Sequence, residues 1–126
     1  MILSWLIALI VPLALIGFGL RILLTPLFLR IEYNMPYFPP DDYGFTKADR
    51  LKWAPYALNY LLNSADISYL GDLKFDDGTP LYNERELSHM DDVKRVAQGA
   101  LRVWYMSLAL LTLLGVWAWR GDWMQV

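Results

Sequence analysis

Hydrophobic positions form two long uninterrupted runs that enclose a mixed, largely polar middle. Residues 1–20 carry no charged side chain, and none lies between Val103 and Trp119. About 20 consecutive apolar residues in a helix are enough to cross a bilayer. The pattern therefore predicts two transmembrane helices, separated by a long segment outside the membrane.

The first run, Ile2–Leu20, corresponds to roughly 28 Å of helix. Pro12 lies inside it, and a membrane helix tolerates proline when neighbouring groups satisfy the freed carbonyl. Arg21 is expected to reach the interface, and a short apolar stretch, Ile22–Leu29, follows and is interrupted by Pro26. A cleaved signal peptide is the alternative, but the run has no basic segment before it and no A-x-A motif after it. We therefore interpret it as a retained helix.

The second run, Val103–Trp119, is bounded by Arg102 and Arg120, and 99–101 would lengthen it. Tryptophan and tyrosine gather at the two interfaces of transmembrane helices. Such residues are Trp104 and Tyr105 at one edge, and Trp117, Trp119 and Trp123 at the other. This pattern indicates a second crossing of the membrane.

The middle segment, residues 31–101, carries seven basic and twelve acidic side chains, a net charge of −5. Thr46 and Asp49 stand at the spacing of a capping box, in which each side chain binds the other's backbone amide. Apolar residues recur after them at helical spacing, which predicts a helix to about Leu62 with a kink at Pro55.

The segments on either side of this helix have turn-forming composition. Residues 35–44 are rich in proline and are expected to be extended, ending in a turn. Asp76–Pro80 predicts a tight turn, which two very short strands, 73–75 and 80–82, would flank.

A last helix is expected to begin just after Asn83. Asn83 and Glu86 match the first and fourth positions of a second capping box. Because no proline follows Glu84 in the sequence, one helix is expected to run through Ala100 and on into the second transmembrane segment.

Together these elements predict an all-α membrane protein, with two transmembrane helices and a small, mostly helical extramembrane domain between them. The expected divisions are 1–30 for the first transmembrane helix and its interfacial extension, 31–101 for the extramembrane domain, 102–120 for the second transmembrane helix and 121–126 for a tail.

Composition agrees with this class. Hydrophobic residues make up 56% of the chain and charged residues 19%, whereas soluble domains average about 45–50% and 25%. These values exclude a soluble globular enzyme. The absence of cysteine excludes disulfides and thiolate metal sites, and a net charge of −2 gives no support for a nucleic-acid partner.

The side of the membrane on which the middle segment lies is contested. Most basic residues close to the spans are on the side of this segment: Arg21, Arg30, Arg85, Lys94, Arg95 and Arg102, against Arg120 on the other side. The positive-inside rule would place the segment in the cytoplasm. That rule is calibrated on loops shorter than about 60 residues, so it does not decide the matter.

The richest set of functional groups surrounds the one histidine of the chain. Glu86, His89 and Asp92 are spaced i, i+3 and i+6, so they share one face of a helix within a 120° arc. A carboxylate partner fixes the tautomer of an imidazole and raises its basicity, as a general base requires. This face is expected roughly 15–20 Å along the helix from Val103, near the lipid headgroups.

Other interpretations of these residues stay open. Glu86 would serve only as a helix cap, and His89 with Asp92 would be an ordinary surface pair. A metal site would need ligands from elsewhere, because there is no second histidine and no cysteine. Ser88 is a poor nucleophile candidate, because its side chain diverges from that of its neighbour on a helix.

Aromatic residues are also frequent in the middle segment. Their simplest interpretation is a small core with an interfacial shelf, and the alternative is contact with an acyl chain or a pigment. They are Tyr33, Tyr37, Phe38, Tyr43, Phe45, Trp53, Tyr56, Tyr60 and Tyr69.

Four short motifs resemble, in order, a bacterial integral membrane family that includes the lipoprotein intramolecular transacylase. They are Glu32-Tyr33-Asn34-Met35-Pro36, Asp42-Tyr43-Gly44-Phe45-Thr46, Tyr60-Leu61-Leu62, and the stretch from Asn83 to Lys94 that contains E-x-x-H-M-x-D-V-K. The resemblance covers residues 1–120. It implies a protein of the bacterial cytoplasmic membrane whose middle segment faces outward.

The resemblance also implies a reaction. In the transacylase, an O-linked acyl chain of a diacylated lipoprotein moves to the amino group of the N-terminal cysteine. His89 matches the histidine that serves as base there. Glu86 and Asp92 match accompanying acidic positions, which would orient it. No cofactor and no metal are implied.

Family members of this kind continue into two further spans that bring another important histidine, which this sequence does not contain. We therefore expect a non-catalytic accessory subunit of a larger membrane complex, for example a photosynthetic or respiratory assembly. Small residues suited to helix–helix contact favour such partners: Gly17, Gly19, Ala109 and Gly115. The alternatives are a half-enzyme completed by a partner chain, and a module that binds lipid or lipoprotein without chemistry.

Overall fold

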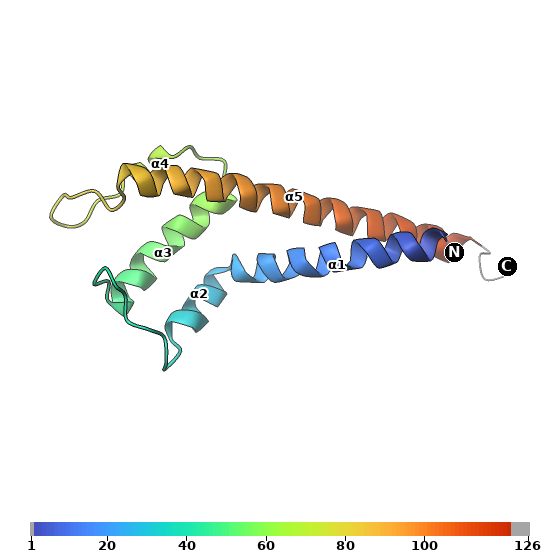
Figure 1. The fold of residues 1–126 in the computed structure, drawn as a ribbon, viewed down its shortest axis with the longest axis horizontal. Helices are drawn as coiled ribbons and strands as arrows, with labels where there is room; N and C mark the ends of the chain where they lie inside the picture. The colour runs from blue at the N-terminus through green and yellow to red at the C-terminus, as the bar shows by residue number, and fades with distance from the viewer. Residues whose placement is uncertain (1, 122–126) are drawn as a thin grey trace. The chain divides into compact units, whose positions relative to one another are not determined.

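The computed structural model describes residues 2–121 and is built from helices (Figure 1). In chain order these are α1 (Ile2–Leu23), α2 (Pro26–Tyr33), α3 (Lys47–Leu62), α4 (Ser68–Gly71) and α5 (Glu84–Arg120). The described residues form no strand. The predicted all-α fold class is confirmed.

The chain divides into two compact units, which we describe separately. The first contains the described residues up to Arg21 and those from Gly99 onward, and the second contains Ile22–Gln98. Helix α5 contributes residues to both units. It is continuous from Glu84 to Arg120, which confirms the expected single helix through residue 100.

Two helices, α1 with 22 residues and α5 with 37, are long and apolar enough to cross a membrane. Only 11% of the most apolar window of each is buried, so neither resembles the core helix of a soluble protein. Large apolar side chains such as Trp5, Ile16 and Met106 are instead about 70% exposed. Exposure of so much apolar surface to water would cost a large amount of free energy, whereas a bilayer would cover it.

Within the first unit, α1 and the second part of α5 lie side by side (Figure 1), and they are in close contact at Gly17. A Cβ atom placed on Gly17 would lie 2.3 Å from Cδ1 of Trp104, so the contact requires glycine. The other small residues do not pack in this way. A Cβ on Gly19 or Gly115 would meet nothing within 4 Å, and Ala109 is exposed.

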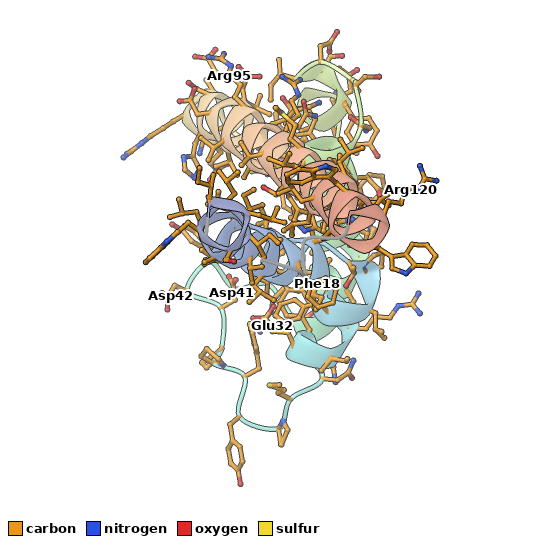
Figure 2. The ribbon with its side chains drawn as sticks, turned by 90° about the vertical axis from the view of Figure 1, so that its right-hand side faces the viewer. Phe18, Glu32, Asp41, Asp42, Arg95 and Arg120 are labelled. Atoms are coloured by element: carbon orange, nitrogen blue, oxygen red, sulfur yellow. The ribbon has the colours of Figure 1, made fainter. Side chains whose placement is uncertain are left out.

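Of the aromatic residues predicted at the two edges of the second span, all but Trp123 lie within the described residues. The rings of Trp104 and Tyr105 have centroids 5.0 Å apart at one edge. Trp117 and Trp119 are exposed on the last turns of α5. The helix ends at Arg120, which Figure 2 labels. Trp123 and the rest of the predicted tail after Gly121 lie outside the described residues.

In the second unit, Pro26 interrupts the apolar extension as expected, but it also begins a helix. Pro26 stands in the first turn of α2, where its missing amide costs no hydrogen bond. The hydroxyl of Thr25 accepts a hydrogen bond from the amide of Phe28, 3.2 Å away, and so caps this helix. Helix α2 then packs against α3.

The capping box predicted for α3 is confirmed. Oγ1 of Thr46 accepts from the amide of Asp49 at 3.2 Å, and Oδ2 of Asp49 accepts from the amide of Thr46 at 2.9 Å. These hydrogen bonds with Thr46 lower the pKa of Asp49 below its usual value. Pro55 lies inside α3 without ending it.

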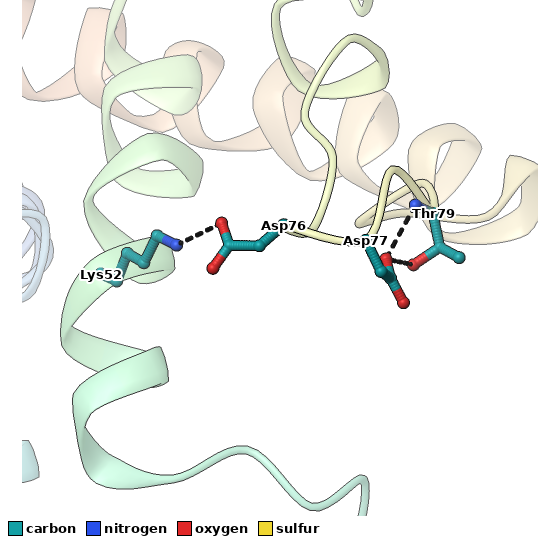
Figure 3. Close-up of polar contacts among 4 residues, drawn as sticks. All are labelled: Lys52, Asp76, Asp77 and Thr79. Carbon is teal, nitrogen blue, oxygen red and sulfur yellow. Dashed lines mark hydrogen bonds and ion pairs between the residues drawn. The ribbon is translucent and has the colours of Figure 1, made fainter.

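The two short strands predicted around residues 76–80 are not formed, although the turn between them is. A single antiparallel bridge joins Lys74 and Pro80. The carboxylate of Asp77 accepts from the amide and hydroxyl of Thr79, at 2.9 and 2.6 Å, and Lys52 of α3 lies 3.4 Å from Asp76 (Figure 3). The segments are too short for a ladder, so side chains hold the turn.

The core of the second unit forms where the end of α3 meets α5. Tyr60 and Leu70 are completely buried there. Lys94 is also buried, with its ammonium 3.9 Å from the centre of the Tyr60 ring. The Gln98 side chain donates to the backbone carbonyl of Asn63 at 2.9 Å. These polar contacts satisfy the end of α3 where the helix stops.

Candidate functional site

His89 opens onto a pocket of about 740 Å³ between the first turns of α5 and the segments before them. The pocket is lined by Tyr43, Tyr82, Asn83, Arg85, Glu86, His89 and Met90. The His89 side chain is exposed. Within residues 2–121, no hydrogen bond or ion pair holds its imidazole, so both ring nitrogens face the pocket or solvent.

Glu86 lies in the same pocket but is occupied by helix capping. Its carboxylate accepts from the amide of Asn83 at 2.9 Å, and the Asn83 side chain accepts from the amide of Glu86 at 3.0 Å. The second predicted capping box is therefore confirmed. A carboxylate used in this way stabilises the start of α5 and fixes the pocket wall, but it makes no hydrogen bond to His89.

Asp92, the other expected partner of His89, pairs instead with an arginine one turn further along the helix. Its Oδ1 lies 3.7 Å from Nη1 of Arg95, which projects outward from α5 (Figure 2). Arg95 also pairs with Asp91, whose carboxylate accepts from the hydroxyl of Tyr60 at 3.3 Å. The structure thus brings Glu86 and His89 to one pocket and directs Asp92 to an ion pair.

A second pocket of about 370 Å³ adjoins the first and is mainly aromatic. The two share Tyr43, Tyr82, Asn83 and Glu86. The wall of the second pocket includes Phe45, Trp53 and Phe75, and the Phe75 ring lies 5.9 Å from that of Phe45 and 6.1 Å from that of Trp53. An apolar chain would therefore find a surface next to the imidazole.

Local backbone structure positions these aromatic side chains. Oδ1 of Asp41 accepts from the amides of Tyr43 and Phe45, at 2.8 and 3.3 Å, and Gly44 adopts a φ of +85°. An L side chain disfavours that backbone conformation. The proline-rich segment therefore ends in a turn, as predicted, and this turn presents Tyr43 and Phe45 to the pockets.

Tyr82 lies where the two pockets meet. Burial raises the pKa of its hydroxyl, and the negative charge of Glu86 raises it further. The hydroxyl therefore stays protonated at neutral pH and can donate a hydrogen bond to a ligand. Sequence reasoning treated Tyr82 only as a strand residue. Its position directly before the Asn83 cap was the signal that it would lie beside the Glu86–His89 face.

Arg85 is another pocket residue that the expected Glu86–His89–Asp92 set omits. It follows Glu84 in the first turn of α5, and it places a permanent positive charge at the pocket that contains His89. The pocket therefore combines a proton acceptor, a hydroxyl donor and a cation. Among residues 2–121, no group of three or more histidine or carboxylate side chains is arranged to hold a metal ion.

Comparisons with known proteins place the chain next to one relative. No family model matches it, and no solved structure matches it. It is 27% identical over 125 residues, 94% of this chain, to an uncharacterized protein of Aquifex aeolicus (strain VF5). The chain spans 58% of the length of that relative. The likeness thus covers almost all of this sequence.

Proposed function

We propose that this chain is an integral membrane protein that binds an acylated substrate and takes part in acyl transfer, with His89 as general base. The observation that supports the proposal most strongly is that an aromatic pocket adjoins the pocket of His89, whose imidazole has no hydrogen-bond partner within residues 2–121. The first provides a surface for an acyl chain, and the second provides the proton acceptor that transfer requires.

The proposed substrate class follows from the resemblance to the lipoprotein transacylase family. The amine of an N-terminal cysteine attacks the ester carbonyl of its own diacylglyceryl group, so a C–N bond forms and the C–O bond to glycerol breaks. His89 takes the proton from the amine and returns it to the departing glyceryl oxygen. Arg85 and the Tyr82 hydroxyl stabilise the negative charge that develops on the carbonyl oxygen.

The test measures acyl migration on a synthetic diacylated lipopeptide by the full chain in lipid nanodiscs. Fragmentation mass spectrometry distinguishes the O-acylated from the N-acylated isomer. We expect His89→Ala to reduce the initial rate by about 100-fold or more, because general-base catalysis contributes that much. Ser88→Ala is the matched control, since Ser88 is the preceding, exposed residue and does not line the pocket.

Two results would contradict the proposal: migration no faster than in empty nanodiscs, and equal rates in the parent and the His89→Ala protein. Retention of the bound lipopeptide without migration would instead identify a binding module.

A second candidate function, an accessory subunit of a larger membrane complex, is favoured by a different observation. An apolar groove of about 530 Å³ lies within the first unit, and its wall includes Leu13, Met106, Ala109 and Leu113. A transmembrane helix of another subunit would fit such a groove, where the small side chain of Ala109 allows close approach.

This candidate predicts stoichiometric co-purification of a partner from native membranes in mild detergent. Ala109→Trp should fill the groove and abolish co-purification of the partner. Leu108→Trp changes the neighbouring residue outside the groove and should not. An unchanged complex with Ala109→Trp, or loss of the complex with His89→Ala, would contradict a purely structural role.

A further inference from the structure

A third pocket lies between α2 and α3 and shares no residue with the two around His89. Its volume is about 440 Å³. Two arginines, Arg30 of α2 and Arg50 of α3, line it together with apolar side chains, among them Leu29, Leu51 and Pro55. Charged and apolar surfaces therefore meet in one cavity.

The two guanidinium groups carry charge that no carboxylate neutralises directly. Among the described residues, neither arginine forms an ion pair within 4 Å. Arg50 is held in place by donating to the carbonyl of Pro39 at 3.1 Å and by lying 4.8 Å from the centre of the Phe38 ring. Its Nε atom is inaccessible to solvent and has no hydrogen-bond acceptor. A buried donor of this kind is rare without a ligand or water.

Tyr33 adds a neutral donor to the pocket. Burial raises the pKa of its hydroxyl, with a further contribution from Glu32, so the hydroxyl is protonated at neutral pH. The two acidic groups whose charges act on Tyr33, Glu32 at the end of α2 and Asp41 in the following segment (Figure 2), do not line the pocket. The carboxylate of Asp41 is engaged by backbone amides.

The chain also keeps the pocket near the end of the first apolar helix. Pro26 lines the pocket and follows Leu23, the last residue of α1, by three residues. Consecutive Cα atoms are 3.8 Å apart, so the separation is at most about 11 Å. When α1 crosses a bilayer its end lies close to the lipid headgroups, so this short connection keeps the pocket within reach of them.

We propose that the pocket between α2 and α3 binds a phospholipid headgroup. Arg30 and Arg50 bind its phosphate, and the apolar wall contacts its glyceryl backbone. Arginine suits this role because its planar group presents several donors to phosphate oxygens. The apolar wall and the nearby end of α1 favour a lipid over a free anion. The site stands independently of acyl transfer at His89.

The experiment measures binding to the full chain in a neutral detergent, by isothermal titration calorimetry with three probes. These are dioctanoyl phosphatidylglycerol, dioctanoylglycerol and inorganic phosphate. We expect saturable binding of the first probe, and binding at least about tenfold weaker for the other two. Arg30→Gln should weaken phosphatidylglycerol binding about tenfold, because it removes a charge-assisted hydrogen bond.

Variants separate this site from general charge and from misfolding. Arg30→Lys should recover most of the affinity. Lys47→Gln removes the same charge from an exposed position of α3 outside the pocket and should have no effect. Arg30 is exposed, and its side chain forms no hydrogen bond within the described residues, so its substitution leaves the fold intact.

Each of the following results would overturn the proposal. Equal binding of dioctanoylglycerol would identify an acyl-chain site, and equal binding of inorganic phosphate would identify a free-anion site. An equal loss with Lys47→Gln would identify general electrostatic attraction, and unchanged binding with Arg30→Gln would remove the assigned phosphate ligand.

Discussion

Lys94 is buried in the second unit, and its charge is satisfied by neutral groups. Its ammonium donates to the backbone carbonyl of Ala65 and to Oδ1 of Asn63, 3.3 Å away, and it lies over the Tyr60 ring. A buried ammonium is costly unless its donors are used. Lys94 therefore fastens the segment after α3 to α5, which explains its place in the motif around His89 without any chemistry.

We predict that Lys94→Met lowers the free energy of unfolding by about 1–3 kcal/mol. The substitution keeps the length of the side chain but leaves the Ala65 carbonyl without its donor, and Oδ1 of Asn63 keeps only the amide of Ala65. An unsatisfied buried acceptor costs about that much. The measurement is denaturant unfolding in detergent, followed by circular dichroism. Lys47→Met, at an exposed position, should change stability by less than about 0.5 kcal/mol. Equal effects of the two substitutions would show that Lys94 does not fasten these segments.

At this scale, sequence reasoning found residues more reliably than it found their partners. The shared helix face of Glu86, His89 and Asp92 followed from spacing alone. The two carboxylates, however, interact with other groups instead of His89: Glu86 accepts from the amide of Asn83, and Asp92 pairs with Arg95. Spacing along a helix restricts which side chains can meet, but it does not rank the partners that other segments and turns offer.

At the scale of elements, Gly17 determines how closely α1 and α5 approach within the first unit. We predict that Gly17→Ala lowers the stability of this helix pair by about 1–3 kcal/mol, because the new methyl group would overlap the Trp104 side chain. The measurement is the SDS mole fraction at which the pair unfolds from mixed micelles.

Gly19→Ala provides the control for this prediction. Both substitutions gain the same helix propensity, up to about 1 kcal/mol, but a Cβ at Gly19 meets nothing within 4 Å. The difference between the two variants therefore isolates the overlap with Trp104. A midpoint for Gly17→Ala at or above that of Gly19→Ala would contradict the close packing.

Helix starts were predictable where they depend on a few adjacent residues. Thr46 with Asp49, and Asn83 with Glu86, specify their capping boxes locally, and both form. The strands around residues 76–80 were not predictable in this way, because a ladder needs more paired residues than the single bridge at Lys74 provides. The cavity between α2 and α3 depends on packing between helices, which no local pattern encodes.

For the whole molecule, two membrane crossings would place the residues between α1 and α5 on one side of the membrane and Gly121, just after α5, on the other. The sequence is ambiguous about which side is which, because its basic residues favour a cytoplasmic middle segment and its family resemblance an external one. The acyl-transfer proposal needs the external orientation, since the lipid-modified cysteine of its substrate class is exposed there.

The chain contains no cysteine, so each introduced cysteine is its only thiol. Tyr37 is 95% exposed in the middle segment, and Gly121 is exposed just after α5. We predict that a membrane-impermeant maleimide labels Tyr37→Cys in intact cells, and labels Gly121→Cys only after the membrane is permeabilised. Labelling of both in intact cells would show that the two helices do not both cross the membrane. The reverse pattern would keep two crossings but place the His89 pocket in the cytoplasm, away from the proposed lipoprotein substrate.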